Sequence, residues 1–203
     1  MDPRPIFPIR HPLVDARVRV PASKSIANRE LVLSAEATGR SRLELGPLDP
    51  GDDVHAMCDA LAALGHDVRW TGDRIEVTPR ENPSAHLTVD AHDAGTVARF
   101  VAALAALYDV EVRIDGSPRM RGRPITSLVE ALRSLGATIQ GDTLPLVIRG
   151  PLRGGEIGIS GYESSQFASA LLLVAARTAL GLQLRLTGDV VSEIGRASCR
   201  ERV

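Results

Sequence analysis

Cysteine is scarce in this sequence, which contains only Cys58 and Cys199 among its 203 residues. The two cysteines form no CxxC pair and no cluster with histidine, so neither a zinc site nor a disulfide framework is indicated. Cys58 lies within an apolar helical pattern, which is typical of a packing residue. The cysteines therefore point to packing rather than to a metal site.

Long apolar runs are also missing. Residues 1–18 contain no apolar stretch of signal-peptide length, and no later segment reaches the roughly 18 uncharged apolar residues that suggest a membrane span. With 44% hydrophobic residues, the chain can still form one sizeable core or two small ones. We therefore expect a soluble, cytoplasmic protein.

The sequence has no excess of charge of one sign. Lysine and arginine together number 24 against 25 aspartates and glutamates, so the formal net charge is −1. No field of the whole molecule favours nucleic acid or a membrane, and neither is expected as a partner. Any site for an anion must therefore be local.

What the sequence does contain is a repeat. Residues 52–79 align with residues 124–150, and Gly65 matches Gly136 at a spacing of 71 positions. Each segment predicts an amphipathic helix that ends at its glycine and is followed by two short strands. The apolar stripe of each helix leaves Asp59, Glu130 and Arg133 on the opposite face, so these helices should be outer helices.

A second set of segments alternates with the first. Residues 25–35, 96–108 and 165–179 predict helices that are apolar nearly all round and therefore buried, and a strand follows each of them. The chain is thus predicted to be an α/β protein of repeated βαβαββ units around buried helices, with the third unit incomplete. A solenoid is the simpler alternative, but fully apolar helices favour a closed globule.

The three predicted buried helices begin in a similar way. Their starts, at residues 21–29, 93–99 and 162–167, are rich in small and polar residues. A helix N-terminus presents unpaired N–H groups and a partial positive charge, which favour a phosphate or carboxylate. A serine or threonine there is usually only a cap. Lys24 and Arg29 also flank an apolar helix start, and this combination predicts a shared anion site.

The residues at these positions resemble a known family. PASKSIANR (residues 21–29) is similar to the SKS-x-x-x-R signature of 5-enolpyruvylshikimate-3-phosphate (EPSP) synthases, and DAGTVARF (residues 93–100) is similar to their N-A-G-T-x-x-R segment. PRMRGRPI and SSQFASALL resemble two further segments in the same order. The resemblance runs from Val20 to Ser192, about half of such an enzyme.

The resemblance implies a reaction and an architecture. The reaction transfers the enolpyruvyl group of phosphoenolpyruvate to the 5-hydroxyl of shikimate 3-phosphate by addition and then elimination of phosphate. It implies no metal and no organic cofactor, only these two small-molecule substrates. The architecture is the inside-out α/β barrel of enolpyruvyl transferases, monomeric at full length. Because both substrates are anionic, cationic side chains and helix ends suit the site.

The resemblance also implies roles for individual residues. Those implied to bind shikimate 3-phosphate are Lys24, Ser25, Arg29, Ser164, Ser165, Gln166 and Ser192. Those implied to bind phosphoenolpyruvate are Lys24, Asp93, Gly95, Thr96, Arg99, Arg123 and Gln166. Lys24 would lie between the two substrates and is the candidate catalytic residue. Preorganised cations are the main stabilisers available to such a reaction.

The basic loop before residue 124 has a simpler interpretation as a solvated surface. Against it, Pro124 fits a helix start just after Arg123, which would direct both that side chain and the helix dipole to one place. We therefore favour a site role for Arg123 but not for Arg119 or Arg121.

Some residues depart from the family pattern. Asp93 stands where the family usually has asparagine, and a carboxylate there would repel an anion unless it is protonated or caps a helix.

Residues 1–19 are assigned to a second domain, residues 20–192 to the domain that binds shikimate 3-phosphate, and residues 193–203 to a tail that fits no part of the repeat. The family's acid and base carboxylates have no match here, so we expect this chain alone to be inactive.

Two other functions remain open. UDP-N-acetylglucosamine enolpyruvyl transferases share the fold, but they typically read SKN at Lys24 and carry a reactive cysteine in the loop that corresponds to residues 118–125. Here Ser25 follows Lys24, and that loop has no cysteine. A non-catalytic repeat module, whose helix ends act only as caps, is the second alternative.

Overall fold

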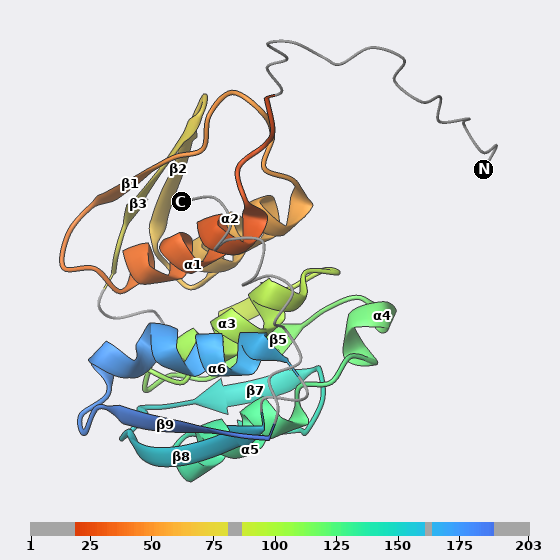
Figure 1. The fold of residues 1–203 in the computed structure, drawn as a ribbon, viewed down its shortest axis with the longest axis vertical. Helices are drawn as coiled ribbons and strands as arrows, with labels where there is room; N and C mark the ends of the chain where they lie inside the picture. Colours follow the sequence, from red (N-terminus) through yellow and green to blue (C-terminus); the bar gives the residue numbers. More distant parts are fainter. Residues whose placement is uncertain (1–18, 81–86, 161–163, 189–203) are drawn as a thin grey trace, which may run out of the picture.

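The computed structural model describes residues 19–80, 87–160 and 164–188, which form three successive units (Figure 1). The first unit consists of α1 (Lys24–Ala35), β1 (Ser41–Glu44), α2 (Asp52–Ala63), β2 (Asp67–Thr71) and β3 (Arg74–Thr78). The second consists of β4 (Leu87–Asp90), α3 (Gly95–Ala105), β5 (Val112–Asp115), α4 (Pro118–Arg121), α5 (Thr126–Ser134), β6 (Thr138–Gln140) and β7 (Leu146–Arg149). The third consists of β8 (Gly155–Ser160), α6 (Ser165–Val174), the 3-10 helix η1 (Ala175–Arg177) and β9 (Leu182–Thr187). Among these residues, no helix combines the length and the apolar character needed to cross a membrane.

The strand order confirms the predicted repeat. The first sheet has the order β1-β3-β2, and the second has the order β4-β5-β7-β6, so that β5-β7-β6 repeats the first arrangement with the same antiparallel pairings. The strands β4 and β5 are parallel and are joined through α3, and β8 and β9 are joined through α6 in the same way. The chain is therefore an α/β protein assembled from repeated units.

The registers place the apolar side of each strand toward the helices. Leu43 of β1 pairs with Ile75 of β3, and Val112 of β5 pairs with Ile148 of β7. All four side chains are buried, whereas their neighbours along each strand are more exposed. Because successive side chains point to opposite faces of a strand, the short alternating runs in the sequence produce this one-sided burial.

The glycines that separate each outer helix from its strand act as predicted. Gly65 and Gly136 have φ values of +96° and +108°, which favour glycine because it has no Cβ. In both cases the next residue donates its N–H to the carbonyl of the third-last helical residue, at 3.1 Å after α2 and 3.0 Å after α5. This Schellman arrangement satisfies carbonyls at the helix end.

The prediction of three buried helices holds for the whole of α3 but only for one side of α1 and of α6. Every residue of α3 is buried. In contrast, Ile26 and Leu33 of α1 are 58% and 51% exposed, and Leu172 of α6 is 57% exposed. The helix α3 packs against α1, α2, α6 and the strands β5 and β7. Within the described residues, α1 and α6 each have one face that nothing covers.

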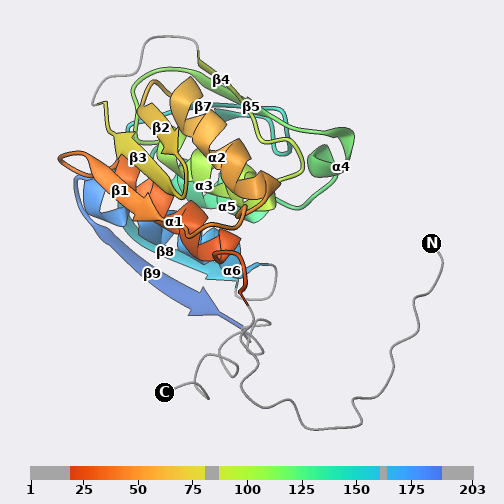
Figure 2. The same cartoon turned by 90° about the horizontal axis from the view of Figure 1, so that it is seen from above.

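Strands lie on the outside of the helices α1, α2, α3 and α6. In Figure 1, α1, α2, α3 and α6 lie between the β1-β3-β2 sheet and the strands β7, β8 and β9. Figure 2 shows these helices between β8 and β9 on one side and β4, β5 and β7 on the other.

Nearly all of the segment predicted as residues 1–19, and the whole of the tail 193–203, lie outside the described residues. The predicted domain division is therefore still a prediction.

Candidate functional site

Hydrogen bonds link the N-terminal halves of the helices α1 and α3. Asn28 of α1 is fully buried, and its Nδ2 donates to Oγ1 of Thr96 at 2.8 Å. The same Nδ2 donates to the main-chain oxygen of Asp53 in α2 at 3.3 Å. The Asn28 side chain therefore fixes the starts of three helices relative to one another.

The helix α6 joins this arrangement through two arginines. Arg29 of α1 donates from Nη2 to Oγ of Ser169 at 3.0 Å. Arg99 of α3 donates from Nη1 to Oε1 of Gln166 at 2.6 Å. The predicted meeting of three helix N-termini is thus confirmed for the helices themselves, since α1, α3 and α6 contact each other within their first two turns.

Lys24 and Ser25 lie at the first turn of α1. The Lys24 Nζ lies 2.9 Å from Oδ2 of Asp53, and the lysine side chain is 59% exposed. The Ser25 side chain is exposed, while its carbonyl accepts a hydrogen bond from Nη1 of Arg29 at 2.6 Å. The guanidinium of Arg29 lies over the ring of Phe100 at 5.2 Å, and partial burial lowers its pKa. These contacts orient Arg29 from three sides.

The start of α6 shows both a cap and a free hydroxyl. Ser164 is the N-cap residue, and its side chain accepts from the N–H of Gln166 at 3.2 Å, so the simple capping interpretation holds for this serine. The side chain of Ser165 is exposed. Ser192 lies outside the described residues. At this helix end the Ser165 hydroxyl and the Gln166 amide can reach a ligand, and the Ser164 hydroxyl can still donate its own hydrogen while it accepts from Gln166.

Gly95 brings two guanidinium groups against the main chain. A Cβ atom at this position would lie 2.7 Å from Nη1 of Arg99 and 2.7 Å from Nη1 of Arg123. Arg99 is buried, and its pKa is lowered to about 10, first by desolvation and then by the nearby positive charge of Arg123. Arg123 is exposed. The glycine thus creates a local concentration of positive charge, as an anion site requires.

The loop before α5 differs from the prediction. Pro124 does not begin a helix, because α5 begins at Thr126 with Ile125 as its N-cap residue. Instead, the unpredicted short helix α4 begins with Pro118, and Ser117 caps it by accepting from the N–H of Met120 at 3.1 Å. Proline suits the first position of a helix, and Pro118 takes that position rather than Pro124.

The other arginines of this loop agree with the sequence analysis. Arg121 forms a two-contact ion pair with Asp115, in which both N to O distances are 2.9 Å. Arg119 is exposed. Arg123, in contrast, contacts Sδ of Met120 at 3.8 Å and lies beside Gly95. Only Arg123 of the three approaches the start of α3 in the described residues.

Asp93 is turned toward the short helix. Its Oδ1 accepts from Oγ of Ser117 at 2.5 Å, and Ser117 in turn caps α4. The side chain of Asp93 is exposed. The carboxylate is therefore part of the connection between the start of α3 and the loop that carries Arg123.

Two cavities lie beside α2, and of these two only the first is lined by a candidate site residue, Asp93. One, of about 420 Å³, is lined by Asp52, Asp53, His55, Ala56, Asp59, His92, Asp93 and Ala94. Its carboxylates make it unsuitable for a phosphate. Within the described residues, no three or more acidic, histidine or cysteine side chains could hold a metal ion.

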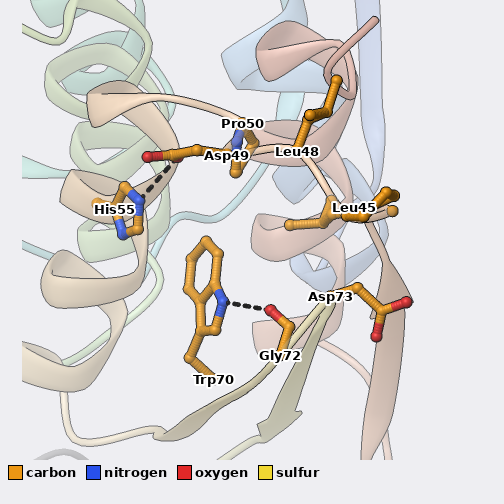
Figure 3. A pocket seen from close by; sticks show the side chains of 10 residues that line it. Leu45, Leu48, Asp49, Pro50, His55, Trp70, Gly72 and Asp73 are labelled. Carbon is orange, nitrogen blue, oxygen red and sulfur yellow. Dashed lines mark hydrogen bonds and ion pairs between the residues drawn. The ribbon is translucent and has the colours of Figure 1, made fainter. Parts of the chain in front are cut away.

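The second cavity, of about 280 Å³, lies in the first unit, between the connection from β1 to α2 and the turn from β2 to β3 (Figure 3). The rings of His55 and Trp70 stack there at 4.5 Å, and His55 lies 3.0 Å from Oδ1 of Asp49. None of the candidate site residues lines this cavity. The candidate site is therefore the face formed by the three helix starts rather than either of these cavities.

Comparison with known proteins decides the family. The sequence model of "EPSP synthase (3-phosphoshikimate 1-carboxyvinyltransferase)" matches residues 10–200, which is more than half of the chain. The chain belongs to the EPSP synthase family.

Relatives within the EPSP synthase family are longer than this chain. A 3-phosphoshikimate 1-carboxyvinyltransferase of Pectobacterium carotovorum is 40% identical over 190 residues, which cover 89% of this chain and 44% of the relative. One from Yersinia pestis is 41% identical over 193 residues with the same coverage. The chain thus spans less than half the length of the curated relatives it matches.

Solved structures agree with the fold of the EPSP synthase family. An EPSP synthase from Acinetobacter baumannii has a TM-score of 0.69 at 22% identity, covering 79% of this chain and 38% of that one. The enolpyruvyl transferase NikO from Streptomyces tendae has a TM-score of 0.53 at 17% identity, covering 80% of this chain and 37% of that one. These likenesses support the α/β architecture of enolpyruvyl transferases.

Three residues at the site were not singled out from the sequence. Asn28 lies inside the first family motif and Ser169 lies inside the last, but neither was given a role. The available signal for Asn28 was an amide on the stripe that otherwise carries Ala27, Leu31 and Ala35 toward the core. Asp53, the partner of Lys24, comes from a different helix, and no local pattern connects the two.

Proposed function

We propose that this chain binds shikimate 3-phosphate and phosphoenolpyruvate and contributes to the transfer of the enolpyruvyl group between them. The observation that carries the proposal is the direct contact between side chains of three separate family motifs. Arg29 of the first motif contacts Ser169 of the last, and Arg99 of the second motif contacts Gln166 of the last. Residues that lie 67 and 140 positions apart in the sequence are thus held at one place, as a shared ligand requires.

Shikimate 3-phosphate is proposed to bind between α1 and α6. The phosphate would lie at the start of α6, where the hydroxyls of Ser164 and Ser165 and the positive end of the helix dipole favour an anion. Ser25 and Arg29 would contact the ring and its carboxylate from α1, with Gln166 beside them and Ser192 as a further contact. A guanidinium is a strong partner for a carboxylate because it offers a planar fork of donors.

Phosphoenolpyruvate is proposed to bind at the start of α3. Gly95 would admit the ligand close to the main chain, and Arg123 would pair with its phosphate or carboxylate. Thr96 and Arg99 support this end from the buried side. Lys24 would lie between the two substrates, and Asp93 would border the site. The two guanidinium groups beside Gly95 support this proposal, because the charge of Arg123 contributes to the lowered pKa of Arg99, and an anion between them would relieve this repulsion.

The proposed reaction has two steps, an addition and an elimination. The 5-hydroxyl oxygen bonds to C2 of phosphoenolpyruvate while C3 receives a proton and the hydroxyl loses one, which gives a tetrahedral adduct. The adduct then loses phosphate from C2 and a proton from C3. Lys24 and Arg123 would stabilise the phosphate as its charge increases on leaving. Asp53 pairs with Lys24 and Asp93 accepts from Ser117, so neither is a free proton acceptor here.

The relatives whose names carry this activity are more than twice as long as the stretch that this chain matches. We therefore propose that the chain supplies the binding face described above and that turnover by this chain alone will not occur. We also propose a cytoplasmic protein that is monomeric at full length and binds neither nucleic acid nor membranes. The near-zero net charge supports this last point.

Calorimetric titration of the 203-residue chain with shikimate 3-phosphate tests the proposal. We expect saturable binding that shikimate without a phosphate does not reproduce. Replacing Arg29 with alanine should abolish the heat, whereas Arg149→Ala should not, because Arg149 is exposed and pairs with Asp109 on another face. If the unmodified chain gives no heat at millimolar ligand, the proposed function is wrong and the repeat-module alternative stands.

A further inference from the structure

Arg99 is a buried cation without a buried anion. It is 4% exposed, and in the part of the chain that the structure describes no carboxylate pairs with it. Its Nε has no hydrogen-bond partner there. A buried charge is unfavourable unless it is well paired, so this position needs a reason other than packing.

The hydrogen bonds of Arg99 all go to segments that carry candidate substrate-binding residues. Its Nη1 donates to Oε1 of Gln166 at 2.6 Å and to the main-chain oxygen of Gly95 at 3.4 Å. Its Nη2 donates to the main-chain oxygen of Pro124, directly after Arg123, at 2.9 Å. The guanidinium also lies 5.3 Å from the ring centre of Phe167. One side chain thus connects the start of α3, the start of α6 and the loop before α5.

The contact with Gln166 has a chemical consequence. A guanidinium has only donors, so the atom of the Gln166 amide that faces Arg99 must be the oxygen. The orientation of a glutamine amide is ordinarily ambiguous, but a partner with donors alone removes that ambiguity. The amide nitrogen then faces away from Arg99, and its two hydrogens have no acceptor within the described residues.

We propose that Arg99 is a positioning residue that presents the amide nitrogen of Gln166 to the oxygen atoms of the bound substrate. The proposal rests on the proposed function, because it concerns the same ligand. Arg99 itself is buried below Gly95 and acts through Gln166 and the main chain. An acceptor-only group at residue 166 would satisfy Arg99 but would offer no hydrogen to the ligand.

One variant, Gln166→Glu, distinguishes the positioning role of Arg99 from a role in packing. Gln166→Glu places a carboxylate beside the buried guanidinium and supplies the missing counter-ion, so we expect a higher melting temperature. The same change removes both amide hydrogens and adds a negative charge next to an anionic ligand, so shikimate 3-phosphate binding should be lost. If Arg99 and Gln166 only packed against each other, Gln166→Glu would not raise the melting temperature while it abolishes the binding of shikimate 3-phosphate.

A double-mutant cycle tests whether Arg99 acts through Gln166. Arg99→Ala and Gln166→Met should each weaken the binding of shikimate 3-phosphate by about tenfold, as expected for a lost hydrogen bond to a charged group. The double variant should bind no more weakly than Gln166→Met alone. Additive losses would overturn the proposal, and so would wild-type affinity of Gln166→Glu. If Arg99→Ala does not fold, Arg99→Lys enters the same cycle, because lysine lacks the planar fork that reaches three acceptors.

A measurement on the free protein keeps this proposal separate from the proposed function. The side-chain amide signals of Gln166 in a nitrogen-15 NMR spectrum should differ between the unmodified chain and Arg99→Lys without any ligand, while Arg149→Lys should leave them unchanged. If these signals do not respond to Arg99→Lys, the positioning role is wrong even if the ligand binds. If they respond but the chain binds no shikimate 3-phosphate, the proposed function fails and Arg99 positions Gln166 for no ligand, which also overturns the inference.

Discussion

The ammonium group of Lys24 lies 2.9 Å from a carboxylate oxygen of Asp53, which holds the candidate catalytic cation at the start of α1 against the start of α2. The main-chain oxygen of Asp53 also accepts from the buried amide of Asn28. The main chain that carries this carboxylate is therefore held by a partly buried hydrogen bond. An incoming phosphate must compete with it for Lys24.

Asp53→Asn should strengthen the binding of an anionic ligand. The amide keeps a polar contact with Lys24 but removes the competing charge, so we expect a fewfold lower dissociation constant for shikimate 3-phosphate at low salt. Stability should change little, since an ion pair as exposed as this one contributes about 0–1 kcal/mol. Calorimetry at two salt concentrations measures the effect. Asp59→Asn, an exposed change of equal charge on the same helix, is the control. An equal gain in both variants would mean that net charge alone is responsible.

Gly95→Ala should disrupt the start of α3. The new methyl group would lie 2.7 Å from a nitrogen of Arg99 and of Arg123, so both guanidinium groups must move. We expect a loss of about 1–3 kcal/mol in the free energy of unfolding, as for other overpacked sites, together with weaker ligand binding. Urea unfolding gives the first quantity. Gly39→Ala is the matched control, because nothing lies within 4 Å of a Cβ there. Equal stability of the two variants would contradict the crowding at Gly95.

Asp93→Asn and Asp93→Ala should have different effects. Asparagine can still accept the hydrogen bond from Ser117, so the cap of α4 persists while a negative charge near the proposed phosphoenolpyruvate site disappears. We expect Asp93→Asn to increase the affinity for phosphoenolpyruvate, and in a full-length enzyme to lower the Michaelis constant for it. Asp93→Ala should lose the connection and destabilise the loop. Ligand titration together with amide hydrogen exchange at residues 117–121 distinguishes the two effects, and identical behaviour of both variants would count against this role.

The stability of the chain should fall on mild acidification because of His66. Burial first, and then the nearby charge of Arg80, lowers the pKa of this imidazole to about 4. His66 accepts from the N–H of Arg80 and contacts the hydroxyl of Tyr108, which donates to Glu36, the partner of Arg177. Below a pKa of about 6.5 the unfolded chain binds a proton that the folded chain rejects, so stability is present above that pH and is lost as the pH falls toward 4.

The size of this effect is at most about 3 kcal/mol, from a pKa difference of about 2.5 units between about 6.5 and about 4. Urea unfolding at pH 7.5 and pH 4.5 should show it in the unmodified chain. His66→Asn, whose amide oxygen can replace the accepting ring nitrogen, should lose less stability between these two pH values. A pH dependence that is unchanged in this variant would show that other groups are responsible.

Local sequence patterns predicted the secondary structure, two helix ends and the repeat of this protein. The alternation of helices and strands and the α/β repeat followed from the periodicity of the apolar residues. Gly65 and Gly136 were predicted at the ends of α2 and α5, because the residue after a helix end commonly needs a positive φ. Pro124 misled the helix boundary because proline also fits other loop positions, and Pro118 took the first helical position instead. The apolar residues of α1 and α6 could not show how much of each helix the described units cover, because burial depends on neighbours and not on the helix itself.

By itself, the sequence determined the repeat, the order of the elements, the family motifs and the residue types that suit an anion. Only the tertiary structure decided which of those residues touch, as in the pairs formed by Lys24 with Asp53 and by Arg99 with Gln166. It also showed that Asp93 accepts a hydrogen bond from Ser117, the residue that caps α4, and that Arg99 is buried. The physical reason is that spacing along a chain specifies which face of its own helix a side chain occupies, whereas its partner across the core depends on how separate helices pack.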